Sequence, residues 1–284
     1  MKKYDIIIVG GGISGIYSMY NLKKKYPHLK VLLVEKNERF GGRVYTHYEK
    51  VDNVDYTMDL GAGRIGYHHK LMVNLIKELK LEKYMHSINN TENYIEYNSN
   101  NGESSNKNSI KEKYSKLLYT FFNSKKLSEL KQSFLESLSL KELLMKFFNK
   151  KDYKNIENTF EYKQKLEHFN SYNAVKYFKE DYNLQSNFFI MTNGLSSIID
   201  SMISIISQNK NYKLKKNAYV ININYNSDIK NYVIKYKNND KLLTASAGYI
   251  ICALPRCDLI KFNILKDYMR DLNTINEISK VRIF

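Results

Sequence analysis

Three glycines near the start of the chain stand at the spacing of a phosphate-binding turn. Gly10, Gly12 and Gly15 supply the glycines of a G-x-G-x-x-G pattern. In such a turn the first glycine permits the tight bend, the second lets the backbone approach a pyrophosphate, and the third lets a helix pack closely on a strand. Ile13 and Ser14 fall at the start of that helix, where free N–H groups and the helix dipole attract phosphate.

An acidic residue follows at the distance that ribose recognition requires. Glu35 lies 20 positions after Gly15, and Lys36 comes next. A carboxylate at this place can accept hydrogen bonds from a ribose hydroxyl, and it would repel a 2′-phosphate. We therefore include Glu35 and Lys36 in the predicted nucleotide site, and NADP is disfavoured as its ligand.

These residues need two strands and a helix to hold them. Tyr4–Val9 is a β-branched run with Asp5 as its one charge, which is typical of a strand buried on both faces. Ile16–Lys25 has apolar residues at helical spacing, and Val31–Val34 is a second apolar strand. The order of strand, turn, helix, strand and acid predicts nucleotide binding, against the alternative of a glycine turn in an unrelated α/β protein.

A second glycine pair follows the second strand directly. Gly41 and Gly42 precede Arg43, and this pattern indicates a loop that passes close to phosphate and presents a guanidinium to it. The alternative is a surface turn with a solvated arginine.

With these residues the chain resembles the flavin-containing amine oxidase family, in which an acid at the strand end and a nearby Gly-Gly-Arg form part of the FAD site. Asn193–Ile199 is similar to the family's Gly-Gly-hydrophobic-x-x-hydrophobic segment, which opens a helix. Asn193 stands in place of its first glycine, and Asn tolerates a left-handed backbone. Further segments are similar to the strands that complete the FAD domain: Leu214–Ile223, Tyr232–Lys237 and Ala247–Pro255.

The resemblance favours FAD over NAD and implies further cofactor contacts. Asp59–Ile65 is similar to the family's third glycine-rich segment, which runs beside the flavin ring. It places Gly61, Ala62, Gly63 and Arg64 in the predicted cofactor site. The resemblance also implies that Ala218 approaches the adenine through its backbone.

Residues 60–81 look most like the L-amino-acid-oxidase branch of that family. The resemblance implies that Arg64 grips a substrate carboxylate, and the planar guanidinium suits this role because it donates two parallel hydrogen bonds. The alternatives for Arg64 are neutralisation of the FAD pyrophosphate or an ion pair with Asp59. His69, five residues later, is expected to cap a helix or lie at the surface.

The composition excludes several other functions. The formal net charge is +16, but the lysines are spread along the chain and only six basic residues are Arg, so nucleic-acid binding is not expected. The two cysteines and the absence of a Cys/His cluster predict neither a disulfide framework nor a metal site. The sequence contains no signal peptide and no apolar run of 18 residues, which predicts a cytoplasmic protein without a membrane span.

The expected fold class is α/β, with a Rossmann-like FAD-binding domain, a helical substrate-domain insertion, and the C-terminal part of the family fold absent. The FAD-binding domain is predicted for 1–66 and 190–260, the mainly helical insertion for 67–189, and the start of further substrate-domain strands for 261–284. Within the insertion, 87–113 is polar and is expected to form a loop, and Ser139 with Glu142 predicts a capping box.

The predicted function is FAD-dependent oxidation of the C–N bond of an amine or amino acid to an imine, with O₂ as acceptor. No catalytic residue can be assigned, and activity is expected only if the missing C-terminal half is supplied, by a second polypeptide or within an oligomer. One alternative is a truncated or degenerate FAD-binding protein without turnover. Another is a desaturase or protoporphyrinogen-oxidase-like flavoenzyme.

Overall fold

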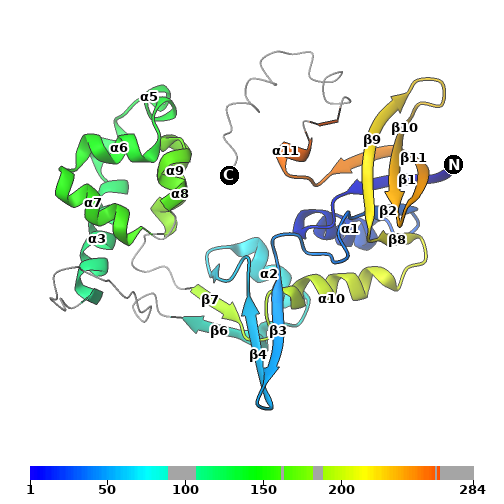
Figure 1. The fold of residues 1–284 in the computed structure, drawn as a ribbon, viewed down its shortest axis with the longest axis horizontal. Helices are drawn as coiled ribbons and strands as arrows, with labels where there is room; N and C mark the ends of the chain where they lie inside the picture. Colours follow the sequence, from blue (N-terminus) through cyan, green and yellow to red (C-terminus); the bar gives the residue numbers. More distant parts are fainter. Residues whose placement is uncertain (89–106, 161–162, 182–187, 260, 263–284) are drawn as a thin grey trace. The chain divides into compact units, whose positions relative to one another are not determined.

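The computed structural model separates the chain into two compact units (Figure 1). The first comprises residues 1–65, 69–86 and 190–279, and the second comprises 66–68, 87–189 and 280–284. The structure describes residues 1–88, 107–160, 163–181, 188–259 and 261–262. The strands predicted for 261–284 and the centre of the loop predicted for 87–113 lie outside these described residues.

A six-stranded sheet forms the centre of the first unit. Ile7 of β1 lies between Leu32 of β2 and Ile250 of β11, and neither Ile7 nor Leu32 has any exposed surface. This burial on both faces is what the apolar residues of the two runs predict. The order of the strands in the sheet is β8 (Tyr212–Lys215), β2 (Val31–Val34), β1 (Lys2–Val9), β11 (Lys241–Cys252), β10 (Asn231–Asn238) and β9 (Ala218–Asn226). The first four pair in parallel, and β10 pairs antiparallel with both β11 and β9.

Helix α1 (Ile13–Lys25) packs against helix α10 (Ser196–Ser207) in the first unit. Ile16 and Met19 are the fully buried side chains of α1. A Cβ atom at Gly15 would lie 2.0 Å from the carbonyl oxygen of Gly10, so the approach of the helix to the first turn depends on a glycine at this position. The Lys23 ammonium donates to the Ile205 carbonyl at 2.6 Å, where it offsets the negative end of α10.

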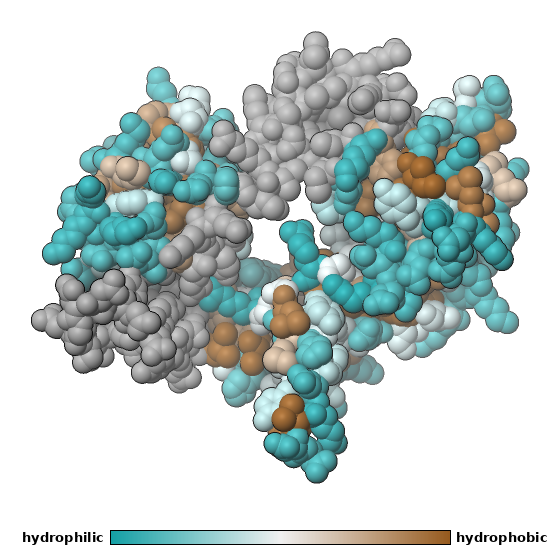
Figure 2. All heavy atoms as spheres, viewed as in Figure 1, coloured by the Kyte–Doolittle hydropathy of each residue, from teal (hydrophilic) through white to brown (hydrophobic). Residues whose placement is uncertain are grey.

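A β-hairpin projects from the first unit, and no sequence pattern predicts it. Strands β3 (Thr46–Val51) and β4 (Val54–Asp59) are joined by Asp52 and Asn53, which both have positive φ, 49° and 63°. This conformation is that of a type I′ turn, which suits the twist of a two-residue hairpin. Val51 and Val54 flank the turn and are exposed, and Figure 2 shows apolar side chains near the hairpin tip.

The second unit is mainly helical, as expected for the insertion. Its core consists of buried side chains from several helices, among them Phe122, Leu140, Ile156 and Phe178. The helices are α3 (Lys107–Phe122), α4 (Lys125–Ser128), α5 (Gln132–Ser137), α6 (Leu140–Phe147), α7 (Lys150–Thr159), α8 (Lys163–His168) and α9 (Ser171–Asp181). Residues 107–113, predicted as loop, therefore belong to α3.

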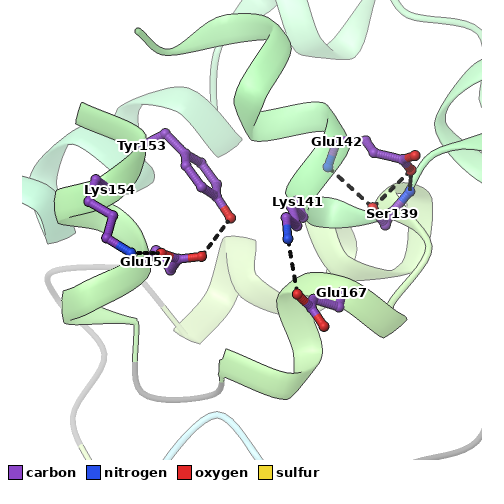
Figure 3. Close-up of polar contacts among 7 residues, drawn as sticks. All are labelled: Ser139, Lys141, Glu142, Tyr153, Lys154, Glu157 and Glu167. Carbon is purple, nitrogen blue, oxygen red and sulfur yellow. Dashed lines mark hydrogen bonds and ion pairs between the residues drawn. The ribbon is translucent and has the colours of Figure 1, made fainter. Parts of the chain in front are cut away.

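The predicted capping box is confirmed at the start of α6 (Figure 3). The Glu142 N–H donates to the Ser139 hydroxyl at 3.2 Å, and the Glu142 carboxylate accepts from the Ser139 N–H at 2.7 Å. Lys141 donates to Glu167 at 3.0 Å and so joins α6 to α8. The N–H groups at the start of α6 are thus satisfied by the capping side chains.

The remaining elements are short. A three-stranded sheet has the order β5 (Ile65–Gly66), β7 (Phe188–Met191) and β6 (Met85–Ile88), and the first unit also holds α2 (Lys70–Glu78), η1 (Glu82–Tyr84) and α11 (Arg256–Leu259). Across the described residues, none of the helices combines the length and hydropathy that a membrane crossing requires. The predicted α/β class with a helical insertion is confirmed.

Two local predictions are wrong. Leu214–Ile223 is not one strand, because β8 ends at Lys215 and β9 begins at Ala218, and the two pair with different neighbours. Asn217, between them, has φ +52°. Asn193 does not take the left-handed conformation either; Gly194 does, with φ +78°, as its N–H donates to the Met191 carbonyl at 2.8 Å in a turn.

The packing of α1 yields the first prediction. Gly15→Ala should lower the free energy of unfolding by about 2–3 kcal/mol, because the new methyl group meets backbone atoms that cannot rotate away. Gly12→Ala is the matched control, since a Cβ there meets nothing within 4 Å and should cost under about 1 kcal/mol. Urea unfolding of the two variants checks this, and equal losses would contradict it.

Candidate functional site

A cavity of about 490 Å³ opens where β1, β2 and β11 end in the first unit. Val9, Val34 and Cys252 are the last residues of these strands, and all three line it. Ligands of α/β proteins bind outside the carboxyl ends of the parallel strands, so this is the expected place for a site. The cavity brings together most of the predicted cofactor residues: Gly10, Gly12, Ile13, Ser14, Glu35, Lys36, Gly42, Arg43 and Ala218.

The first turn and the start of α1 form one wall. Gly10 has φ +103°, and a Cβ there would lie 2.4 Å from the Ala253 carbonyl oxygen, so both the bend and the neighbouring strand require glycine. Gly12 is the N-cap of α1 and has no side chain to accept the helix's first N–H groups. Ile13 and Ser14 therefore present an uncapped helix N-terminus to the cavity, which attracts an anion.

Glu35 forms a second wall and is buried, with 6% of its surface exposed. One carboxylate oxygen accepts the Gly11 N–H at 2.7 Å. The other accepts the backbone N–H and the side-chain amide of Asn37, at 2.9 and 2.8 Å. A carboxylate offers about four acceptor positions, so these three donors satisfy its burial and leave one position for a ligand hydroxyl.

The second glycine loop closes the cavity beside the first. Gly42 has φ +59°, and a Cβ there would lie 3.2 Å from the Gly12 Cα atom, so the two glycine loops are in close contact. The Gly41 N–H donates to the Gly11 carbonyl at 2.8 Å. Arg43 lines the cavity, and its guanidinium has no hydrogen-bond or ion-pair partner in the part of the chain that the structure describes.

The third glycine segment touches this loop but does not line the cavity. The Ala62 N–H donates to the Arg43 carbonyl at 3.2 Å, and a Cβ at Gly61 would lie 2.0 Å from the same oxygen. Gly63 and Arg64 lie farther along, with Arg64 half-buried directly before β5. Gly15 is likewise outside the lining, because it faces the first turn.

His69 lies at the N-cap position of α2, as expected for a capping residue. Its carbonyl accepts the Met72 and Val73 N–H groups at 2.9 and 3.0 Å. Its imidazole makes no capping hydrogen bond and is exposed, so the cap comes from the backbone.

A polar network holds the base of the hairpin to the start of α10. The Thr46 hydroxyl donates to Asp59 at 2.6 Å and accepts the Ser196 N–H at 2.9 Å. The second Asp59 contact is the Leu195 N–H at 3.0 Å. A Cβ at Gly194 would lie 2.2 Å from the Thr46 side chain, so the glycine after Asn193 serves this close contact.

Sequence reasoning missed part of the cavity wall. Asp258, Lys261 and Phe262 line it, beyond the predicted Ala-x-Pro end of the strand, and no motif marks them. Asp258 lies 2.8 Å from Lys261 and 3.7 Å from Lys36. The hydrogen bond from Lys261, with the charge of Lys36, lowers the pKa of Asp258 from its ordinary value. Burial raises the pKa of the Cys252 thiol, so this lining side chain stays uncharged.

These features fit the diphosphate and ribose of a dinucleotide. The uncapped start of α1 and the unpaired Arg43 guanidinium supply positive potential on one side of the cavity. The buried Glu35 supplies an acceptor for hydroxyl groups. The open space at Gly12 admits a ligand atom where any other residue would place a side chain.

Known proteins share parts of this sequence and fold. Flavin-containing amine oxidase A of Sus scrofa is 40% identical over 85 residues, which are 30% of this chain and 15% of that protein. A probable flavin-containing monoamine oxidase A of Dictyostelium discoideum is 37% identical over 81 residues, 28% of this chain and 16% of that protein. The chain thus matches less than a fifth of the length of either relative.

A solved structure of a putrescine oxidase variant has a similar fold, with a TM-score of 0.60 and 17% identity. The similarity covers 90% of this chain and 58% of that one. The chain also matches the model of the flavin containing amine oxidoreductases over residues 13–266, far more than half of its length. The chain therefore belongs to the flavin containing amine oxidoreductase family.

Proposed function

We propose that the first unit binds FAD and that the chain serves the oxidation of an amine to an imine. The observation that carries this proposal is the meeting of the two glycine loops, which brings the start of α1 and the unpaired Arg43 guanidinium to one cavity that Glu35 also lines. Membership of a flavin enzyme family supplies the class of cofactor, and the dinucleotide form is supported by this cavity.

Each part of the cavity suits one part of FAD. We assign the pyrophosphate to the α1 start and the Gly42–Arg43 loop, since both offer positive potential. Glu35 would accept a hydrogen bond from the ribose, and the Ala218 backbone would approach the adenine. The segment 61–64 is assigned to the flavin side, because the Arg43 carbonyl binds its backbone. Residues 1–66 and 190–260 would then form the FAD-binding domain and 67–189 the substrate domain.

Bound flavin would supply two-electron redox chemistry, in which the carbon that bears the amine nitrogen loses the equivalent of a hydride and the nitrogen loses a proton, leaving a C=N bond. We propose O₂ as the final acceptor, which would be reduced to H₂O₂. The chain's own residues would hold the dinucleotide and exclude water from it. No described residue is assigned as a catalytic acid, base or nucleophile.

The substrate class is proposed as an amine, with L-amino acids as the narrower hypothesis. The relatives are named as amine oxidases. The putrescine oxidase is 17% identical to this chain, and at that identity the similarity supports the fold and not the substrate. The amino-acid hypothesis rests on Arg64, half-buried beside β5 in the segment that contacts the Arg43 carbonyl. A guanidinium there would bind a carboxylate through two parallel hydrogen bonds.

Reconstitution tests the cofactor. After incubation with FAD and removal of the free cofactor, the chain should retain the visible absorbance of bound flavin. Gly12→Ala should bind FAD about tenfold more weakly, because a methyl group would occupy the open space that the cofactor needs. Its free energy of unfolding without FAD should be unchanged within about 1 kcal/mol. Absence of bound flavin in the unaltered chain would refute the proposal.

Peroxide release with amines separates a turning-over enzyme from the alternative of an FAD-binding protein without turnover. Tight FAD binding with no peroxide from any amine or amino acid would favour that alternative for this chain. Peroxide from an amine would support oxidation with O₂ as acceptor.

The role of Arg64 is tested by a change of substrate. Arg64→Met should lower kcat/KM for L-amino acids by about ten- to a hundredfold, because the charge-assisted hydrogen bonds to the substrate carboxylate are lost. The kcat/KM for amines without a carboxylate should stay nearly unchanged. Steady-state peroxide assays on matched amine and amino-acid substrates check this. Equal losses for both classes would show that Arg64 does not bind the carboxylate.

A further inference from the structure

Arg39 contacts the second glycine loop without lining the cavity. Its guanidinium donates to three carbonyl oxygens of that loop. Nη2 donates to Gly42 at 2.7 Å, and Nη1 donates to Val44 at 3.2 Å and to Phe40 at 3.3 Å. Three alternate carbonyls of the segment 40–44 therefore point toward one side chain.

The direction of these carbonyls fixes the direction of the N–H groups between them. Every peptide bond of the described chain is trans, so each C=O and the next N–H point in opposite directions. The Phe40 carbonyl faces Arg39, and the Gly41 N–H accordingly reaches the Gly11 carbonyl at 2.8 Å.

The same geometry applies one step later. The Gly42 carbonyl faces Arg39, which turns the Arg43 N–H away from that guanidinium. Gly42 and Arg43 line the cavity, and the Arg43 N–H has no acceptor among the described residues. This N–H is thus left available to a ligand oxygen.

An aromatic ring holds the Arg39 guanidinium in place. The guanidinium carbon lies 4.3 Å from the centre of the Tyr45 ring, within the range of a cation–π contact. Tyr45 follows directly after the loop, so both ends of the loop are attached to the same guanidinium. The guanidinium reaches these carbonyls from two nitrogens, Nη1 and Nη2, held in one plane. The three N–H groups of a lysine ammonium all leave a single nitrogen, so they match carbonyls spread along the loop less well.

We infer that Arg39 is a positioning residue for the diphosphate of the bound nucleotide. It orients the Gly41 and Arg43 peptide groups and does not touch the ligand. The inference rests on the proposed function and deepens it, because it separates the arginine that would meet the phosphates, Arg43, from the one that shapes the loop.

The test uses ADP, which carries the diphosphate, and adenosine, which lacks it. Their affinities are measured by calorimetric titration for the full chain, Arg39→Ala, Arg39→Lys and the control Lys25→Ala, which removes one charge from an exposed residue at the end of α1. In Arg39→Ala the ADP affinity should fall by about tenfold or more, and the adenosine affinity should stay within about twofold. Arg39→Lys should not restore ADP binding.

Each other result overturns the inference in a recognisable way. An ADP affinity for Arg39→Ala equal to that of Lys25→Ala shows that the loop keeps its shape without Arg39. An ADP affinity in Arg39→Lys equal to that of the unaltered chain shows that the charge at position 39 is sufficient and the guanidinium geometry is not needed. Parallel loss of adenosine binding shows general damage to the fold. No ADP binding by the unaltered chain refutes the proposed function itself, which the other three results leave standing.

Discussion

The buried carboxylate of Glu35 is the contact on which the rest of the site depends. A carboxylate without water is costly unless N–H donors surround it, and here Gly11 and Asn37 supply them. The backbone of Glu35 also donates to the Lys215 carbonyl and accepts the Ala218 N–H, both at 2.8 Å. One residue therefore joins the first glycine loop, the end of β2 and the passage from β8 to β9. The position of the first glycine loop follows from satisfying this buried charge.

The charges around the cavity are arranged in two groups. The α1 start and Arg43 have no acidic partner among the described residues, so their positive potential is available to a ligand. Lys36 and Lys261 are instead paired with Asp258. The net charge of +16 does not distinguish these cases, because most lysines are scattered over the surface. The two groups differ in their ion pairs. Lys36 and Lys261 are paired with Asp258, whereas Arg43, where the two glycine loops meet, has no ion-pair partner among the described residues.

The sequence predicts those features that depend on neighbouring residues. The Gly10 turn, the close packing of Gly15 and the capping box at Ser139 each involve a few adjacent positions, and the structure has all three. The hairpin network could not be predicted, because Thr46 meets Asp59 and Ser196 across 13 and 150 positions. Asn193 was misassigned because the conformation of a turn depends on which residue faces Thr46, and that residue is Gly194. The wall formed by Lys261 and Phe262 has no local signature at all.

In the proposed function, binding of the cofactor is separable from choice of the substrate. Every residue that lines the cavity belongs to the first unit, whereas the helical unit has its own core of buried leucines and phenylalanines. The proposed affinity for a nucleotide would therefore depend on the interior of the first unit alone. Arg64 lies outside the cavity lining, in the segment that we assign to the flavin side, so a change there should leave the affinity for ADP intact. The chain spans 58% of a structurally similar oxidase, so the proposed nucleotide binding and the proposed turnover are two quantities that have to be measured separately.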